Sequence, residues 1–199
     1  MNPGASGAYK FGQGIVFDNP YMASSCTHAL LSAWSQLRSE NLEAVKDAKL
    51  ITVTSNGFTK KSYNALPFIL RPFYKYILAI PRQDKRATEH LISQCATNSE
   101  SYECDAEEVA ELEKAGALAP NWKESLSQDK WLDAVVVRPS ILTDGKSLCE
   151  IQGAKAIRTG PEDLCGTWNV SRRDVGWFIA RMVVKDYNTW NGRAITVSY

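Results

Sequence analysis

Few side chains of this sequence could carry reaction chemistry, and the candidates are hydroxyls and amines rather than metal ligands. Its two histidines are His28 and His90, and its five cysteines include no Cys-x-x-Cys pair and are irregularly spaced. Metal centres and cysteine nucleophiles need such residues in defined combinations. The sequence therefore predicts neither a metal site nor a Cys-His catalytic pair, and we expect the cysteines and histidines in the core or at the surface.

The first candidate for donation to a substrate is Ser55, which follows an expected strand. Residues 49–54 form a β-rich run that ends abruptly at Ser55-Asn56-Gly57, a pattern that predicts a strand opening into a loop. A hydroxyl at a strand end can donate to a reacting carbonyl. The alternative is that Ser55 caps the loop and takes no part in chemistry.

The second candidate is Lys85, in a helix expected over residues 83–95. Glu89 lies four residues further along the same helix face, so the two side chains could form an ordinary ion pair. The neighbouring Arg82 and Arg86 are interrupted by acidic residues, as on a solvated helix face. Lys85 is therefore either a functional amine or one half of a surface pair.

The clearest strand covers residues 132–138 and is followed by Pro139 and Ser140. Its Ala-Val-Val-Val run is typical of a central parallel strand that is covered by helices on both faces. Pro139 should stop the strand, which leaves Arg138 at its end. The simplest interpretation of Arg138 is a strand-end residue in a polar network.

The remaining elements alternate along the chain. A helix is expected over residues 21–37, with one buried apolar stripe. The stripe consists of Cys26, Ala29, Leu30, Ala33, Trp34 and Leu37. Strands are expected at 167–170 and 194–198, on either side of a helix over 172–185 that has Ser171 as its N-cap. This alternation predicts a three-layer α/β architecture.

Composition restricts the class of protein. The 199 residues are 44% hydrophobic and 23% charged with a net charge of +1, which suits a single globular domain, with the acidic stretch 96–129 as a surface elaboration. Basic residues are scattered, which argues against a nucleic-acid partner. No apolar run approaches the roughly 20 residues of a membrane span, and the first residues lack the pattern of a secretory signal. We expect a soluble, cytoplasmic protein.

Four segments stand in a recognisable order along the chain. They are Val53-Thr54-Ser55-Asn56-Gly57, Lys85-x-x-x-Glu89, Val137-Arg138-Pro139-Ser140 with its continuation to Gly145, and Ser171-Arg172-Arg173-Asp174-Val175. Together they resemble the atypical short-chain dehydrogenases, over about residues 45–199. More narrowly, Arg71-Pro72-Phe73-Tyr74 followed by residues 78–85 is similar to the fungal NmrA-like NAD(P)-binding proteins.

The resemblance implies a Rossmann-type, doubly wound and mainly parallel sheet with helices on both faces, whose strand-end loops face NADP or NAD. Thr54 and Ser55 would lie beside the nicotinamide, and Lys85 would reach the ribose hydroxyls. The implied cofactor-binding residues are Thr54, Ser55, Lys85, Arg138, Pro139 and Ser140, and the implied catalytic residues are Ser55 and Lys85. The implied reaction is hydride transfer by an NADP-dependent oxidoreductase.

Two departures from the family pattern leave three interpretations open. The family's first strand and G-x-x-G-x-x-G turn are not found, since Gly4-Ala-Ser-Gly7 imitates only the glycines, so an incomplete sheet is expected. Pro81 stands where the family has a tyrosine, four residues before Lys85. The chain is then an NADP-linked reductase or its remnant, a non-catalytic NmrA-like dinucleotide-sensing module, or a fragment without independent function that self-associates through an exposed sheet edge.

Overall fold

The computed structural model describes residues 7–10, 14–57, 78–99, 102–127, 129–160, 164 and 168–199. Composition predicts one domain, and the contacts within the chain form two compact units. Unit 1 comprises residues 1–47, 66–95 and 103–130, and unit 2 comprises residues 48–65, 96–102 and 131–199. Tyr74 and the segment Gly4 to Ser6, which the sequence analysis considered, lie outside the described residues.

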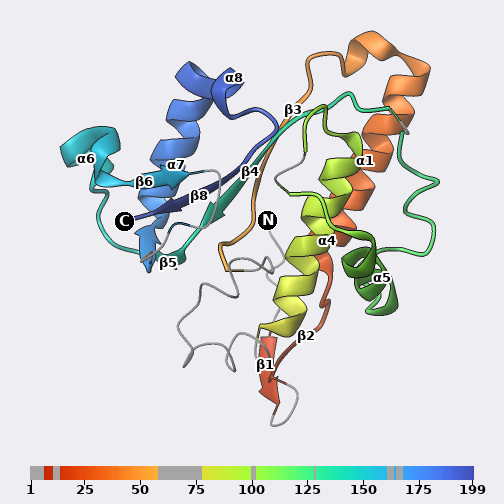
Figure 1. The fold of residues 1–199 in the computed structure, drawn as a ribbon, viewed down its shortest axis with the longest axis horizontal. Coiled ribbons are helices and arrows are strands. Elements are labelled where there is room, and N and C mark those ends of the chain that lie inside the picture. Colours follow the sequence, from red (N-terminus) through yellow and green to blue (C-terminus); the bar gives the residue numbers. More distant parts are fainter. Residues whose placement is uncertain are drawn as a thin grey trace. The chain divides into compact units, whose positions relative to one another are not determined.

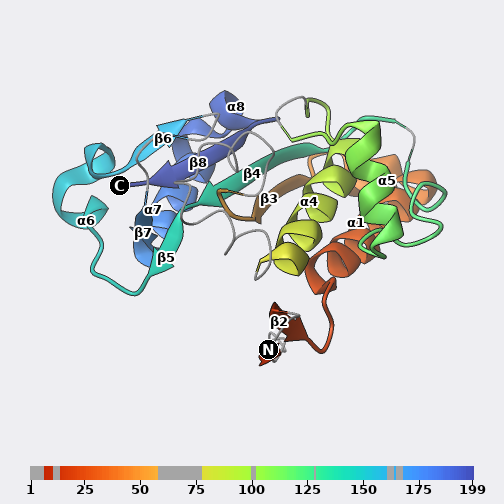
Figure 2. The same cartoon turned by 60° about the horizontal axis from the view of Figure 1, so that its bottom comes forward.

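Unit 1 is mainly helical. Its helices are α1 (Met22–Glu40), α4 (Ala79–Cys95) and α5 (Ala106–Lys114), with a short turn η1 (Leu42–Ala44) and an antiparallel pair of strands, β1 (Gly7–Lys10) and β2 (Gly14–Phe17). Helix α4 packs along α1 and also contacts α5 (Figures 1 and 2). The backbone N–H groups of Ala23 and Ser24 donate to the carboxylate of Asp84 at 3.1 and 2.8 Å, so a side chain of α4 caps the first turn of α1.

The predicted apolar stripe of α1 is not its buried face. Leu30 and Leu37 are 39% and 44% exposed, and Cys26 is exposed, whereas Ser24 and Leu31 are buried. The prediction was wrong because helical spacing identifies apolar faces without identifying which of them meets a partner. The partner helix α4 contacts the face that carries Ser24 and Leu31.

The acidic stretch 96–129, which was expected to be a surface elaboration, also contributes buried residues. Leu112, Leu118, Trp122 and Leu126 in this stretch are nearly fully buried. Helix α5 is amphipathic, and most of its glutamates are exposed while one face of the helix is buried. Overall charge concealed this buried face from the sequence analysis.

Unit 2 contains a mixed, mainly parallel sheet in the order β3-β4-β8-β6. β3 (Lys49–Val53), β4 (Asp133–Pro139) and β8 (Ala194–Ser198) are parallel, and β6 (Arg158–Gly160) runs antiparallel beside β8. The three parallel strands lie where the sequence predicted them, and β4 is interior. The predicted α/β fold class with a mainly parallel sheet is confirmed.

Helix α7 (Arg172–Arg181) covers one face of this sheet (Figures 1 and 2). There Val135 and Val137 of β4 pack in one cluster with Val175 and Phe178 of α7. Side chains of β4 are buried on both faces, as its β-branched run predicts. Below α7, the short strands β5 (Ile141–Thr143) and β7 (Asn169–Ser171) pair in parallel.

The helix predicted over residues 172–185 changes its geometry within that range. After α7 come a π-helical turn, η4 (Met182–Asp186), and the short helix α8 (Tyr187–Trp190). The short helix α6 (Cys149–Gln152) and the 3-10 turn η3 (Gly153–Ala156) precede β6. None of the helices in the described part of the chain has the length and apolar character that crossing a bilayer requires.

Candidate functional site

The carboxyl ends of β3 and β4 lie side by side because these parallel strands are neighbours in register. The backbone N–H of Thr54 donates to the carbonyl of Val137 at 2.9 Å, and the N–H of Asn56 donates to the carbonyl of Pro139 at 2.9 Å. The second bond joins the loop after β3 to the end of β4. The structure thereby brings together five of the residues nominated from the sequence, which are Thr54, Ser55, Arg138, Pro139 and Ser140.

Ser140, directly after β4, carries an unsatisfied hydroxyl at the carboxyl ends of these strands. Its backbone N–H donates to the carbonyl of Val197 at 3.0 Å, but the residue is only 7% exposed and its Oγ has no hydrogen-bond partner among the described residues. Leaving such a group unpaired costs about 1–3 kcal/mol. Buried polar atoms in folded proteins are nearly always paired, so an unpaired hydroxyl at a strand end indicates a position where a ligand could bond.

The other strand-end side chains differ in their surroundings. Thr54 and Arg138 are 6% and 5% exposed, so both are held inside unit 2. Ser55 is half-buried, and its hydroxyl donates to the carbonyl of Asn56 at 3.3 Å, a long bond within the loop. Gly57 follows with a φ of 87°, a left-handed conformation that glycine adopts without strain. The loop-capping alternative for Ser55 therefore has a contact in its favour, and its catalytic role stays a prediction.

A buried carboxylate, Asp174, fixes the segment that follows β5. It is fully buried and receives hydrogen bonds from five donors. These are the hydroxyls of Ser147 (2.5 Å), Ser171 (3.0 Å) and Tyr199 (2.5 Å) and the N–H groups of Leu148 (3.0 Å) and Cys149 (2.9 Å). Burial by itself would raise the pKa of Asp174, but these hydrogen bonds hold the pKa well below its ordinary value.

The N-terminus of α7 explains why Asp174 occupies this position. The side chain of Ser171 accepts a hydrogen bond from the N–H of Asp174 at 3.0 Å, which confirms Ser171 as the predicted N-cap. The carboxylate of Asp174 in turn bonds back to Ser171 and across to the loop. The sequence predicted the cap but not the network, for which the spacing of Ser171 and Asp174 is the readable signal.

Lys85, the remaining nominated residue, belongs to unit 1 rather than to unit 2. It lies half-buried on α4, and its ammonium forms no ion pair with any residue that the structure describes. Glu89 is 2% exposed and accepts a hydrogen bond from Arg86 at 2.6 Å. The described residues thus give Glu89 a different partner from the surface pair considered above. Pro81 lies in the first turn of α4, where a missing N–H is tolerated.

Arg86 and its partners correct the expectation that this face of α4 is solvated. Asp84, Arg86 and Glu89 are all less than 9% exposed. Arg86 donates to both carboxylate oxygens of Glu108 on α5, through Nε at 2.8 Å and Nη2 at 2.9 Å. Burial would raise the pKa of Glu108, but hydrogen bonds from Arg86 and its charge bring that pKa below its ordinary value. The expectation failed because the acidic partner comes from a distant part of the sequence.

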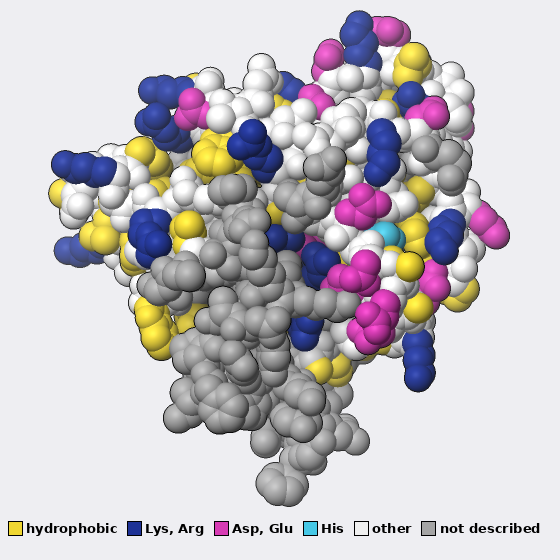
Figure 3. Space-filling model, in the orientation of Figure 1, with side chains coloured by type: hydrophobic (Ala, Val, Ile, Leu, Met, Phe, Trp, Pro, Cys, Tyr) yellow, Lys and Arg dark blue, Asp and Glu magenta, His cyan; other side chains and the backbone are white. Residues whose placement is uncertain are grey.

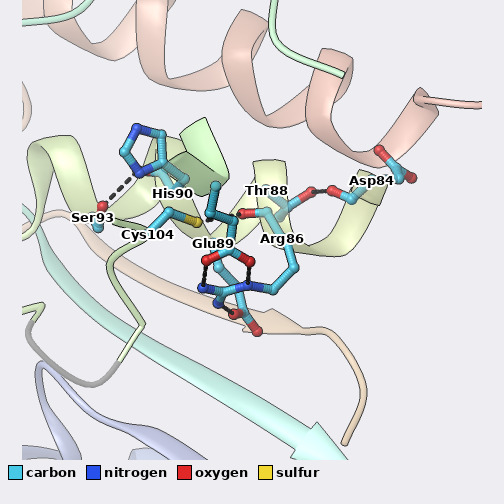
Figure 4. A network of polar contacts seen from close by, with 8 residues as sticks. Asp84, Arg86, Thr88, Glu89, His90, Ser93 and Cys104 are labelled. Carbon is cyan, nitrogen blue, oxygen red and sulfur yellow. Dashed lines mark hydrogen bonds and ion pairs between the residues drawn. The ribbon is translucent and has the colours of Figure 1, made fainter. Parts of the chain in front are cut away.

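His90 and Cys104 lie close to this cluster and are uncharged at neutral pH (Figure 4). His90 is 4% exposed, and its ring meets that of Trp122 edge to face at 5.1 Å. Neither ring nitrogen has a hydrogen-bond partner in the part of the chain that the structure describes. Burial lowers the pKa of His90 to about 4 and raises the pKa of the Cys104 thiol to about 12. Across the described ranges, no three metal-ligating side chains come together.

The surface carries mixed charge. Figure 3 shows Lys and Arg side chains interspersed with Asp and Glu side chains on the face in view. Hydrophobic side chains gather over the part of unit 2 that holds α6 and β5 (Figure 3). The exposed apolar residues there include Ile141 and Ile151, which are 59% and 74% exposed.

Comparison with known proteins gives relatives but no matching family model. The chain is 29% identical over 189 residues to Reductase pytE of Aspergillus terreus, an alignment that covers 92% of this chain and 60% of the relative. It is 26% identical over 206 residues to Oxidase pynE of Aspergillus niger, covering 98% of this chain and 62% of the relative. The chain therefore spans about three fifths of the length of the curated relatives that it matches.

Solved structures share the fold. A wide-type short-chain dehydrogenase/reductase of Veillonella parvula in complex with NADP superposes with a TM-score of 0.50 at 12% identity, covering 92% of this chain and 69% of that chain. An ethylated short-chain dehydrogenase/reductase from the same organism also gives a TM-score of 0.50 at 12% identity, covering 90% and 67%. The chain thus has a short-chain dehydrogenase-like α/β fold.

Proposed function

We propose that this chain, which shares the short-chain dehydrogenase fold, forms the nicotinamide and substrate side of an NADP- or NAD-dependent oxidoreductase. One observation carries the proposal: the loops after β3 and β4 are joined by the Asn56 to Pro139 bond, and beside them Ser140 Oγ is buried without a partner. Parallel strands of such sheets bind dinucleotides at their carboxyl ends. The relatives named reductase and oxidase support the same class of reaction.

The strand-end side chains fit the nicotinamide end of a dinucleotide. The carboxamide of nicotinamide has both a donor and an acceptor, and the hydroxyl of Ser140 can serve either. Thr54 offers a second hydroxyl at the end of the neighbouring strand, and Arg138 lies before Pro139 on β4. The bound dinucleotide would supply the hydride, and the strand ends would hold its ring in a fixed position.

Ser55 and Lys85 are proposed for the substrate and ribose. The half-buried hydroxyl of Ser55 could leave its long bond to the Asn56 carbonyl and donate to a substrate carbonyl. Lys85, which belongs to unit 1, is proposed for the ribose hydroxyls. Its assignment rests on the family resemblance alone.

A second candidate is a dinucleotide-sensing module that binds the cofactor without turnover, in the manner of NmrA-like proteins. Pro81 favours it, because a proline cannot donate the proton that a tyrosine at this position would supply. The existing bond of the Ser55 hydroxyl to its own loop favours it as well.

The third interpretation, self-association through an open sheet edge, also has an observation in its favour. β3 is the outermost strand of its sheet among the described residues, and Val53 at its end is 40% exposed. An unpaired strand edge is a template for pairing with another chain. Light scattering after size exclusion would detect such association, and a monodisperse monomer that melts cooperatively would contradict it.

The cofactor test uses Ser140→Ala on the full chain. Because the Oγ is unpaired, the variant should be at least as stable as the parent without ligand, yet bind NADPH on the order of tenfold more weakly if the hydroxyl bonds the cofactor. Ser25→Ala, an exposed serine of α1, is the matched control and should change neither quantity. Calorimetry and thermal melting with NADPH, NADP, NADH and NAD measure both.

The outcomes separate the proposals. If none of the four dinucleotides binds or raises the melting temperature, the cofactor assignment fails. If NADPH binds and is oxidised with aldehydes or quinones, Ser55→Ala abolishes only the oxidation, and Lys85→Ala also weakens NADPH binding, the oxidoreductase is supported. Binding without turnover, unchanged by these two substitutions, supports the sensing module.

A further inference from the structure

Unit 2 contains a cavity of about 210 Å³ that shares no residue with the strand ends described above. Its walls come from the helical segment α7 to α8, from Ile157 and from Thr159 of β6. Figure 1 shows these elements in the C-terminal half of the chain. An apolar cavity of about 150 Å³ holds a benzene ring, so this one has room for a single ring with a substituent.

The inner walls are aromatic and apolar. Trp177, Phe178 and Trp190 line the cavity together with Ile157 and Met182. Phe178 and Trp190 pack edge to face, with ring centroids 6.1 Å apart and an interplanar angle of 71°, which fixes their orientation. Aromatic walls in fixed orientations favour a planar aromatic occupant over a puckered aliphatic one.

The mouth of the cavity carries one ion pair. Arg181 lies with its guanidinium carbon 5.7 Å from the centre of the Trp177 ring, within cation–π range. Its Nε is 3.4 Å from Oδ2 of Asp186, and the two side chains are 42% and 40% exposed. The ion pair uses Nε, so the terminal amino groups of the guanidinium can donate to an oxygen of a ligand.

The π-helical turn η4 builds this arrangement. Met182 at its start and Asp186 at its end both line the cavity, and Arg181 directly precedes it. A π turn is rarer than an α turn and often occurs at functional sites. It also turns Val183 and Val184 outwards, where they are 52% and 78% exposed. The departure from α-helical geometry is thus located at the cavity.

From these four observations we infer that this cavity is a binding site for a single planar ring that carries a carbonyl or carboxylate oxygen. The ring packs against Trp177 and Trp190, and the oxygen accepts hydrogen bonds from Arg181. The site is separate from the proposed dinucleotide site and does not depend on it, since its residues lie between Ala154 and Thr159 and in the segment from α7 to α8.

Benzoate is the probe for this site. We expect it to bind the full chain with a dissociation constant on the order of 1 mM, as suits nine non-hydrogen atoms, and to shift the indole N–H signals of Trp177 and Trp190 in NMR spectra. Trp177→Phe and Trp190→Phe assign these two signals. Cyclohexanecarboxylate has the charge without the planar ring, and benzylammonium has the ring with the opposite charge. Both should bind at least five times more weakly.

Arg181→Met tests the oxygen contact and should weaken benzoate binding about tenfold. Arg172→Met is the matched control on the same helix, because Arg172 is exposed, pairs with Asp144 and does not line the cavity. Equal weakening by both substitutions would show a general charge effect and overturn the inference. Absence of indole shifts, or equal binding of benzylammonium, would overturn it too, and these two results need no variant to fold.

Discussion

Asp174 in unit 2 and Arg86 in unit 1 are both buried and charged, but their surroundings differ. Asp174 has five neutral donors, which are three hydroxyls and two backbone N–H groups. Arg86 has two carboxylates, those of Glu89 and Glu108. Close to Arg86, neither ring nitrogen of His90 has a hydrogen-bond partner among the residues that the structure describes.

Because their buried charges have different partners, the two units should be sensitive to different perturbations. The network of Asp174 consists of one charged carboxylate and neutral donors, several of them in loops. Its stability therefore depends on the loops holding these donors at hydrogen-bonding distance. The cluster of Arg86 depends on opposite charges balancing one another, and buried charges that lose a partner are strongly destabilising. We therefore expect unit 1 to be the more sensitive to pH and unit 2 to depend mainly on packing and geometry.

Removing the buried carboxylate of Asp174 in unit 2 should cause the largest loss of stability. Asp174→Ala leaves three hydroxyls and two N–H groups without their acceptor and should lower the free energy of unfolding by about 4 kcal/mol. Urea unfolding measures the loss, and hydrogen exchange should locate it in β5, α6 and α7. Asp144→Ala removes an exposed carboxylate that pairs with Arg172 and should cost under about 0.5 kcal/mol. Equal losses in the two variants would contradict the role given to the network.

The corresponding change in unit 1 is Arg86→Met, which should lower the free energy of unfolding by about 3 kcal/mol at neutral pH. Without Arg86, burial is no longer opposed and raises the pKa of Glu108. The loss should therefore grow as pH rises, and it should shrink as pH falls and the carboxyl takes up a proton. Urea unfolding at several pH values measures it. Arg38→Met, which breaks a surface pair with Asp129, is the control, and a pH-independent loss would exclude the charge-balance account.

Two glycines with positive φ, one in each unit, differ in the space that a Cβ atom would have. Gly192 in unit 2 and Gly116 in unit 1 have φ values of 77° and 75°. A Cβ on Gly192 would lie 2.8 Å from the carbonyl oxygen of Asn98, whereas a Cβ on Gly116 would meet nothing within 4 Å. Gly116→Ala should cost about 1 kcal/mol from backbone strain alone, and Gly192→Ala about 2–3 kcal/mol. Thermal melting of the two variants tests this, and equal shifts would show that the contact with Asn98 relaxes freely.

The smallest expected effect is the loss of stability in mild acid. The pKa of His90 is lowered to about 4, so its contribution to stability is complete above the unfolded pKa of 6.5 and is lost as pH falls from there towards 4. Between pH 7 and 5.5 the loss should be about 1 kcal/mol, and hydrogen exchange should find it in unit 1. Asp174, with its pKa below 3.8, should begin to lose its contribution only below about pH 4. His90→Phe should flatten the first decline, and an unchanged pH profile would contradict this assignment.

Local sequence patterns were enough for the parallel strands of unit 2 and for the start of α7, but they did not predict β5, β6 or α6. β-branched runs placed β3, β4 and β8, and Ser171 was correctly predicted as a helix cap. Each of these signals lies within a few consecutive residues, where backbone preference and side-chain type act directly. The nomination of residues at the ends of β3 and β4 followed from the same patterns together with the family resemblance.

Unit 1 could not be predicted in the same way. Its buried pairs join residues far apart in the sequence, such as Arg86 with Glu108 and Asp84 with Ser24, so composition and periodicity placed the buried charges at the surface and the wrong face of α1 inside. The acidic stretch likewise supplies buried residues, both from one face of the amphipathic α5 and from the segment that follows it.

The sequence by itself determined the α/β class, the parallel strands and the residue types at their ends. Only the tertiary structure decided that β3 and β4 are neighbours, that the hydroxyl of Ser140 is buried without a partner, and that a π turn shapes a cavity beside Trp177. The reason is physical: strand and helix preference is a property of neighbouring residues, whereas burial and hydrogen-bond satisfaction depend on what the rest of the chain brings to the same place.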